Sequence, residues 1–281
     1  MTEIAIIYHD PCPDGLAAAW ITFQELNPYG HRIRMIPTGY DTNPPDLPSE
    51  TNIWIVDFSY PPDVLAELAA KHERVIVLDH HATAAEALGG TEGLPALGAD
   101  GTIDVDRSGA GIAWDWWHPT LPRPWWVDYV EDRDLWRWAL PDSRAINAWI
   151  GCHHLTFDLF FLWGEAEVVP DEIMVEAGGA LRMLNATVAR QARYARSCEI
   201  GGDVMPVVNA TAHMSETTEE VLILHDATLA AYFTHNGTAW NYGFRSIDGS
   251  ARAVAERLGG GGHPNAAGCK STEQLHHIIT P

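Results

Sequence analysis

Short, nearly continuous hydrophobic runs alternate with amphipathic stretches over the first third of the chain. Residues 3–8, 52–57 and 74–79 are rich in β-branched side chains, a pattern typical of central strands of a parallel sheet that is covered on both faces. Between them, residues 15–26 and 61–72 repeat apolar positions at helical spacing. Strands that alternate with helices predict an α/β fold with a parallel sheet and flanking helices.

The rest of the chain predicts a second, smaller α/β domain. A Gly-rich loop (89–101) precedes Trp-rich helices near 110–117 and 124–138, and a long helix follows at 171–198. After it we expect a helix that Gly259 ends and four strands, at 204–212, 221–225, 228–234 and 239–246. We therefore expect a first domain over 1–170, a helical linker over 171–198, and a second domain over 199–281, with the active-site cleft between the two domains.

Three successive predicted strands end in side chains that can bind metals. His9 and Asp14 lie just beyond the first strand, Asp57 ends the second, and the triplet Asp79-His80-His81 ends the third. Ligands bind beyond the carboxyl ends of strands in open α/β sheets, so these groups should converge. A single strand-end aspartate is commonly a helix cap or turn residue, but capping explains three in succession poorly.

Such a cluster offers imidazole nitrogens and carboxylate oxygens to two divalent ions. This donor set suits manganese, magnesium or iron better than metals that prefer thiolates. Two ions roughly 3.5–4 Å apart would clamp an in-line displacement at phosphorus, and Asp57, at the middle strand end, is the natural bridge.

The net charge of the chain restricts the kinds of molecule that it can bind. At −21 over 281 residues, the surface repels polyphosphate backbones, so a long nucleic-acid duplex is an unsuitable partner. Only two of the 17 basic residues are lysines, and a phosphate grip must therefore come mainly from arginine. No apolar run is long enough for a membrane span, and residues 1–8 do not resemble a secretory signal. Four scattered cysteines suggest reduced thiols, so we expect a cytoplasmic protein without a membrane partner.

The order of these motifs resembles that of the DHH phosphoesterases, a family that includes oligoribonucleases (nanoRNases), RecJ-type exonucleases, cyclic-dinucleotide hydrolases and family II pyrophosphatases. The matching residues are His9, Asp14-Gly15, Asp57 and Asp79-His80-His81. The C-terminal segment from Gly259 to Gly268, preceded by Arg245-Ser246, is similar to the Gly-rich signature of the DHH-associated substrate domain. The resemblance thus spans most of the chain.

The resemblance implies roles for individual residues. His9 and Asp57 would hold one metal, and Asp14, Asp57, His80 and a later aspartate the other; Asp132 fits that last position, with Asp134 as its rival. Asp79 would orient the neighbouring imidazole, and His81 would face the scissile phosphate. Cys12 stands where the family usually has an aspartate. If Cys12 binds as a thiolate, the first site becomes softer and accepts zinc or iron more readily; otherwise Asp10 or water must complete it.

The Gly-rich segment suggests a phosphate site. Backbone N–H groups of Gly261 and Gly262 can close around a phosphate, since glycine lacks a Cβ. Arg245 and His263 offer charge-assisted hydrogen bonds. The remaining substrate candidates are Ser246 beside Arg245, Asn265, which could pair with a base or sugar edge, and Ser108, which either lines the cleft or caps a helix.

The combined hypothesis is a manganese-dependent phosphodiesterase that cuts short oligonucleotides or dinucleotides with water activated by two metals. Magnesium, iron or zinc are alternative ions, and a homodimer is compatible with the sequence. Two rival functions stay open: a phosphatase for a nucleotide phosphomonoester or pyrophosphate, and a non-catalytic nucleotide-binding regulator in which Cys12 has impaired one metal site. We interpret most tryptophans between 114 and 138 as core packing rather than as base-stacking platforms.

Overall fold

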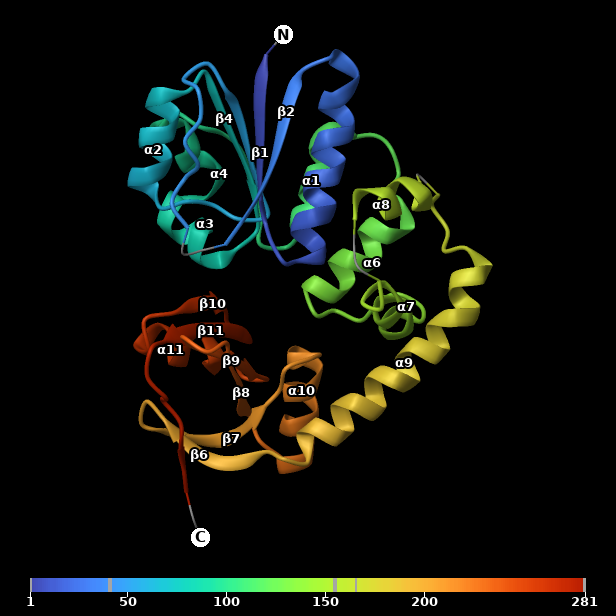
Figure 1. Ribbon diagram of the computed structural model, residues 1–281, viewed down its shortest axis with the longest axis vertical. Coiled ribbons are helices and arrows are strands. Elements are labelled where there is room, and N and C mark those ends of the chain that lie inside the picture. The colour runs from blue at the N-terminus through green and yellow to red at the C-terminus, as the bar shows by residue number, and fades with distance from the viewer. Residues whose placement is uncertain (1, 40–41, 154–155, 165, 280–281) are drawn as a thin grey trace. The chain divides into compact units, whose positions relative to one another are not determined.

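The computed structural model describes residues 2–39, 42–153, 156–164 and 166–279. The chain divides into two compact units, Met1–Leu181 and Arg182–Pro281. The division falls inside the long helix α9 (Asp171–Ala192), and each unit has its own sheet (Figure 1).

The first unit is built on a five-stranded parallel sheet in the order β2-β1-β3-β4-β5, which confirms the predicted fold class. The three predicted strands are β1, β3 and β4 at its centre. We did not predict β2, whose apolar positions are interrupted by Arg32 and Arg34, or the four-residue β5. The bounds are β1 Glu3–His9, β2 Arg32–Thr38, β3 Asn52–Val56, β4 Arg74–Asp79 and β5 Asp100–Ile103.

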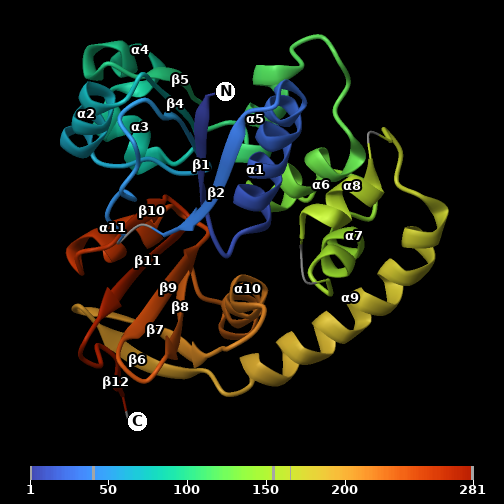
Figure 2. The same cartoon turned by 45° about the horizontal axis from the view of Figure 1, so that its top comes forward.

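Helices cover both faces of this sheet, as Figures 1 and 2 show for α1 on one face and α2 on the other. Alternate strand residues point to opposite faces, so Ile6 and Ile76 pack with α1, α5 and α6, whereas Ile7 and Val77 pack with α2 and the segment around Leu94. The bounds are α1 Pro13–Leu26, α2 Pro62–Lys71, α3 Ala82–Leu88, α4 Gly90–Gly93, α5 Gly109–Trp117 and α6 Trp125–Asp134.

Tryptophans from α5 and α6 fill one of these two cores. Trp114, Trp125 and Trp126 are each less than 10% exposed and pack against α1, α7 (Ser143–Ile150) and α8 (Phe157–Trp163). For these three residues the structure bears out the interpretation as core packing.

The second unit holds a seven-stranded sheet in the order β10-β11-β9-β8-β7-β6-β12, antiparallel except for the pair β7 and β8. Helices α10 (Met214–His225) and α11 (Ser250–Arg257) pack on different cores of this sheet. The strands are β6 Arg196–Ile200, β7 Asp203–Asn209, β8 Leu229–His235, β9 Trp240–Ser246, β10 Gly261–His263, β11 Ala266–Ser271 and β12 His277–Ile278.

Two sequence predictions in this part of the chain are wrong. The apolar run 221–225 is the end of α10, not a strand; Val221 and Leu222 are buried while Ile223 and Leu224 are exposed. A short apolar run does not distinguish the two element types. The long helix ends at Ala192 rather than at Cys198, because Cys198 already belongs to β6, which pairs with β7.

No helix among the described residues is both long enough and apolar enough to cross a membrane.

We expect the change Gly101→Ala to destabilise the first unit by about 2–4 kcal/mol. Gly101 lies in β5 with φ +140°, and a Cβ would stand 1.9 Å from the carbonyl oxygen of Val77 on β4. Chemical denaturation followed by circular dichroism measures the loss. The control is Gly151→Ala, because Gly151 has an ordinary φ of −67° and room for a methyl group. Equal stability of the two variants would contradict the prediction.

Candidate metal centre

The carboxyl ends of β1, β3 and β4 carry a compact group of buried acids and histidines. One candidate ligand atom from each of Asp14, Asp57 and His80 lies within 4.8 Å of the others, and the same holds for His9, Cys12 and Asp57. Asp14, Asp57 and His80 are only 1–2% exposed. The structure thus brings together five residues singled out from the sequence, in two groups that share Asp57.

Asp57 is held between the two groups. Its backbone has φ +61°, an uncommon value for a non-glycine residue, and its N–H donates to Leu78 on β4. Its Oδ2 lies 3.5 Å from Nδ1 of His9, and its Oδ1 lies 3.1 Å from Nε2 of His80. Among the described residues, neither buried oxygen accepts a hydrogen bond of standard geometry. Burial would raise the pKa of Asp57, but the facing imidazoles of His80 and His9 hold it below its usual range. A charged, buried carboxylate that turns one oxygen toward each ligand group fits a residue that could face a cation on each side.

Asp14 is fixed by the start of another helix. It lies in the first turn of α1, and its two oxygens accept hydrogen bonds from the backbone N–H groups of Gly109 (2.6 Å) and Ala110 (2.8 Å) at the N-terminus of α5. A Cβ on Gly109 would stand 2.7 Å from the Cβ of Asp57, and one on Gly15 would stand 2.2 Å from the carbonyl oxygen of His9. These two glycines let the chain close tightly around the acids.

Ser108 supports this arrangement as the cap of helix α5. It is fully buried, and its Oγ accepts a hydrogen bond from Gly111 N as the N-cap of α5. The structure thus confirms the helix cap, one of the two roles that the sequence left open for Ser108, and a role in substrate binding stays a prediction. Its own N–H donates to Oε2 of Glu131, at 3.0 Å.

Glu131 belongs to a partly buried charge network that sequence reasoning missed. Its Oε1 lies 3.0 Å from Arg123 and 3.3 Å from Arg137, while Arg123 also pairs with both oxygens of Asp115. The network anchors the loop from which the N–H groups reach Asp14. No local motif reveals it, because Glu131 and Ser108 are 23 residues apart.

Within the Asp-His-His triplet, Asp79 contacts a different histidine ring from the one expected. Asp79 accepts from the backbone N–H of His80 (2.7 Å), and its Oδ1 lies 2.8 Å from Nδ1 of His81. The carboxylate therefore orients the ring of His81, not that of His80 as expected. The His80 ring instead lies among Asp14, Asp57 and Asp134.

The two candidate aspartates of α6 occupy different surroundings. Asp134 Oδ2 is 3.5 Å from Nε2 of His80. Asp132 instead accepts hydrogen bonds from Ala139 N at 2.9 Å and Ser143 Oγ at 2.5 Å. This geometry favours Asp134 as the member of the metal centre, whereas Asp132 organises the turn that follows α6.

The buried groups of the cluster strongly perturb one another. Burial and the carboxylates of Asp57 and Asp134 hold the pKa of Asp14 well above its ordinary range, and burial with the same acids raises the pKa of the Cys12 thiol. Burial alone would lower the pKa of His80, but Asp57, Asp134 and Asp14 raise it to about 10. At neutral pH the metal-free cluster therefore retains protons that a divalent cation would displace.

In the second unit, the Gly-rich segment forms a hairpin rather than a free loop. Gly262 in β10 pairs with Ala267 in β11, and with φ +137° its Cβ would stand 2.7 Å from the carbonyl oxygen of Ala266. His263 ends β10. The predicted roles of Gly261, Gly262 and His263 in substrate binding stay predictions.

Asn265 and Ser246 hold this hairpin against α11. Asn265 Oδ1 accepts from Gly249 N at 2.8 Å, and Ser246 Oγ accepts from Ala251 N at 3.0 Å. Both side chains thus accept hydrogen bonds from backbone N–H groups at the start of α11, a structural role that the sequence did not predict. Arg245 beside them donates to Ser215 Oγ at 2.6 Å, with its guanidinium 5.8 Å from the ring centre of Tyr232.

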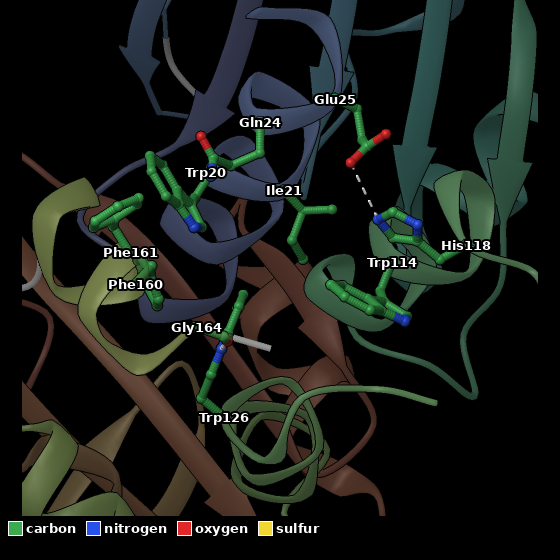
Figure 3. Close-up of a pocket in the computed structure, with 10 residues that line it drawn as sticks. All are labelled: Trp20, Ile21, Gln24, Glu25, Trp114, His118, Trp126, Phe160, Phe161 and Gly164. Carbon is green, nitrogen blue, oxygen red and sulfur yellow. Dashed lines mark hydrogen bonds and ion pairs between the residues drawn. The ribbon is translucent and has the colours of Figure 1, made fainter. Parts of the chain in front are cut away.

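A cavity of about 180 Å³ lies elsewhere in the first unit, among α1, α5, α6 and α8 (Figure 3). Its walls are mainly aromatic, with Trp20, Trp114 and Phe160 among them, and Glu25 and His118 form an ion pair of 3.3 Å beside it. None of the residues that line it belongs to the acid and histidine cluster, so it is not part of the candidate metal centre.

Comparison with curated sequences identifies a viral relative. No family model matches the chain. An uncharacterised protein, R106, of Acanthamoeba polyphaga mimivirus is 23% identical over 285 residues, which is 94% of this chain. The chain spans 66% of the length of that relative.

Comparison with solved structures shows the fold. An exopolyphosphatase-related protein from Bacteroides fragilis aligns with a TM-score of 0.53 and 12% identity, covering 98% of this chain and 88% of that one. RecJ from Thermus thermophilus in complex with Mn²⁺ aligns with a TM-score of 0.51 and 15% identity, covering 95% of this chain and 49% of RecJ. A second structure of exonuclease RecJ, bound to manganese, aligns with a TM-score of 0.50 and 15% identity, covering 95% and 85%.

We expect Asp134→Asn to weaken the binding of Mn²⁺ by about 10–100-fold with little loss of stability, because it removes a charge that faces His80. Asp132→Asn should do the reverse and lower the free energy of unfolding by about 1–3 kcal/mol, because it leaves buried donors poorly paired. Isothermal titration calorimetry and chemical denaturation measure the two effects. If Asp132→Asn abolished metal binding while Asp134→Asn did not, the assignment would be reversed.

Proposed function

We propose that this chain, which has the fold of the DHH phosphoesterases, is a divalent-metal-dependent phosphodiesterase that hydrolyses short oligonucleotides or dinucleotides. The observation that carries the proposal is the pair of ligand groups that share Asp57 at the carboxyl edge of the sheet. A carboxylate shared by two adjacent ligand sets could hold two ions close together, as a two-metal hydrolysis of a phosphate ester uses them. The manganese named for the RecJ structures supports manganese as the first ion to test.

Each group of the centre has a proposed task. When bound, divalent ions would supply Lewis acidity toward the phosphate and a nucleophile derived from water at neutral pH. Asp57 would hold the ions together, with Asp14, His80 and Asp134 around one position. His81 would contact the scissile phosphate, since Asp79 engages its Nδ1 and so fixes the orientation of the ring.

We assign substrate recognition to the second unit. Arg245 offers a guanidinium whose planar fork suits a terminal phosphate, and its contact with Ser215 holds it in place. Residues 201–281 contain only four basic residues against eight acidic ones. So little positive charge suits a substrate with one or two phosphates better than a long strand or a compact polyanion such as pyrophosphate.

A change at the bridging residue tests the catalytic part of the proposal. Asp57→Asn should lower the rate of hydrolysis of a 5′-labelled dinucleotide in Mn²⁺ by more than about a hundredfold, since even outer-shell partners of metal ligands are worth 10–100-fold. Asp63→Asn on the exposed side of α2 is the matched control and should leave the rate unchanged. Retained turnover in Asp57→Asn would remove the bridge from the mechanism.

The same assay separates the rival functions. The wild-type protein is to be compared on dinucleotides, cyclic dinucleotides, a nucleoside bisphosphate and pyrophosphate. We expect the largest kcat/KM with linear dinucleotides or short oligonucleotides. Preferred cleavage of pyrophosphate or of the bisphosphate would replace the phosphodiesterase by a phosphatase, and tight nucleotide binding without product would indicate a regulator.

A change at Arg245 tests the proposed role of the second unit in substrate recognition. Arg245→Ala should raise KM for the dinucleotide by about ten- to hundredfold, the loss expected for one charge-assisted hydrogen bond, with a smaller change in kcat. The matched control is Arg193→Ala, because Arg193 is exposed near the end of α9. An unchanged KM in Arg245→Ala would remove this residue from the substrate site.

A further inference from the structure

The two ligand groups that share Asp57 differ in one donor. The group around His80 offers carboxylate oxygens from Asp14 and Asp57 besides its imidazole nitrogen, with Asp134 3.5 Å away. The group around His9 offers one imidazole nitrogen, one carboxylate oxygen and the sulfur of Cys12. The sulfur is the single soft donor in the centre, and it belongs to one side only.

We propose that Cys12 is a metal ligand and that it makes the centre chemically asymmetric. The position formed by His9, Cys12 and Asp57 takes a borderline divalent ion such as Zn²⁺, Fe²⁺ or Co²⁺, and the oxygen-rich position around His80 takes Mn²⁺ or Mg²⁺. The proposal rests on the proposed function only in that both use the same centre; metal binding by Cys12 can be measured without any substrate.

The geometry of this group fits one small ion. Nitrogen and oxygen ligands on a tetrahedral ion lie about 3.4 Å apart when both bonds are close to 2.1 Å. The distance between His9 Nδ1 and Asp57 Oδ2 is 3.5 Å. The sulfur of Cys12 lies within 4.8 Å of a ligand atom of both residues, so a modest inward movement of one side chain completes three bonds. Solvent or substrate would supply the fourth, as in open catalytic sites.

Independent evidence for a ligand comes from Asp57. Its side chain is 1% exposed, it points one oxygen to each side, and Oδ2 on the His9 side has no hydrogen-bond donor of standard geometry among the described residues. A buried carboxylate oxygen without a donor costs free energy unless a cation pairs with it. The Cys12 sulfur therefore lies next to a buried carboxylate oxygen that lacks a well-aligned donor and that faces the His9 ring, so the three ligand atoms surround one position that a cation could take.

The local backbone also suits a thiolate at this position. Cys12 is the residue before the first turn of α1, a helix of 14 residues, and it has extended φ and ψ of −141° and 129°. The N-terminus of a helix stabilises negative charge, thiolates included. On binding, the thiol gives its proton to solvent and the sulfur forms the bond to the metal, so that charge and atoms balance without any redox partner.

The experiment uses cobalt as the probe on the full chain, stripped of metal by a chelator. Titration with Co²⁺ in the absence of substrate should give a thiolate-to-cobalt charge-transfer absorption in the near ultraviolet. We expect this absorption in the wild type and in Cys152→Ser, whose exposed thiol lies outside the centre, and we expect it to be lost in Cys12→Ser and Cys12→Asp. Cobalt binding without the absorption in the wild type would overturn the proposal.

A second measurement needs no change at Cys12. Alkylation of the wild-type protein, mapped by peptide mass spectrometry, should show that Zn²⁺ protects Cys12, while the exposed Cys152 reacts equally with and without metal. Equal reaction of Cys12 in both conditions would contradict coordination even if every Cys12 variant failed to fold.

Metal preference gives the third measurement. After dialysis against equal concentrations of Zn²⁺ and Mn²⁺, the ratio of bound zinc to bound manganese should fall by at least about tenfold in Cys12→Asp, because even outer-shell partners change metal affinity by 10–100-fold. An unchanged ratio would count against the asymmetric centre.

The possible outcomes distinguish failure of this inference from failure of the proposed function. If dinucleotides are hydrolysed in Mn²⁺ but cobalt gives no charge-transfer absorption, the role of Cys12 fails and the phosphodiesterase stands. If the absorption appears but no phosphate ester is cut with any metal combination, the phosphodiesterase fails and Cys12 remains a metal ligand. If stripped protein binds no divalent ion at all, both fail.

Discussion

Two buried carboxylates, Asp14 and Asp57, stand side by side at the edge of a parallel sheet, and the rest of the first unit is arranged around them. Burial of two like charges is costly unless they are paired. Asp14 receives two backbone N–H groups from α5, whereas Asp57 has only facing imidazoles. In the metal-free protein the proton of His80, whose pKa is raised to about 10, supplies positive charge beside Asp57, and the proposed divalent cations would take over that role.

This constraint explains features that otherwise seem unrelated. The amides of Gly109 and Ala110 reach Asp14 because Glu131 and Arg123 hold the loop that Ser108 ends. Side chains at positions 15 and 109 would collide with His9 and Asp57. The partly buried ion pairs around Arg123 are weak evidence of stability in themselves, but they fix where the N–H groups of α5 point.

The sequence predicted which side chains lie at the carboxyl ends of the central strands, but it did not predict the tertiary contacts around them. Strands β1, β3 and β4 are continuous apolar runs, and a parallel sheet places their ends together, so His9, Asp57 and His80 could be brought into one centre from pattern alone. Asp132 and Asp134 lie two residues apart on α6, and only tertiary contacts decide which faces His80. The same applies to Ser108, which the sequence left as either cap or cleft residue, and to α10, whose apolar end resembles a strand.

The cysteine at position 12 follows from the same electrostatic constraint. Asp14, Asp57 and Asp134 already crowd the space beside it, and an aspartate there would add a fourth carboxylate to the metal-free protein. A thiol is neutral when no metal is bound, so it spares the folded chain that repulsion. It would provide a negative ligand if a cation displaced its proton. With the proposed role as a metal ligand, a cysteine at this position would combine folding without metal and binding of metal in one crowded, buried centre, with a softer donor on one side.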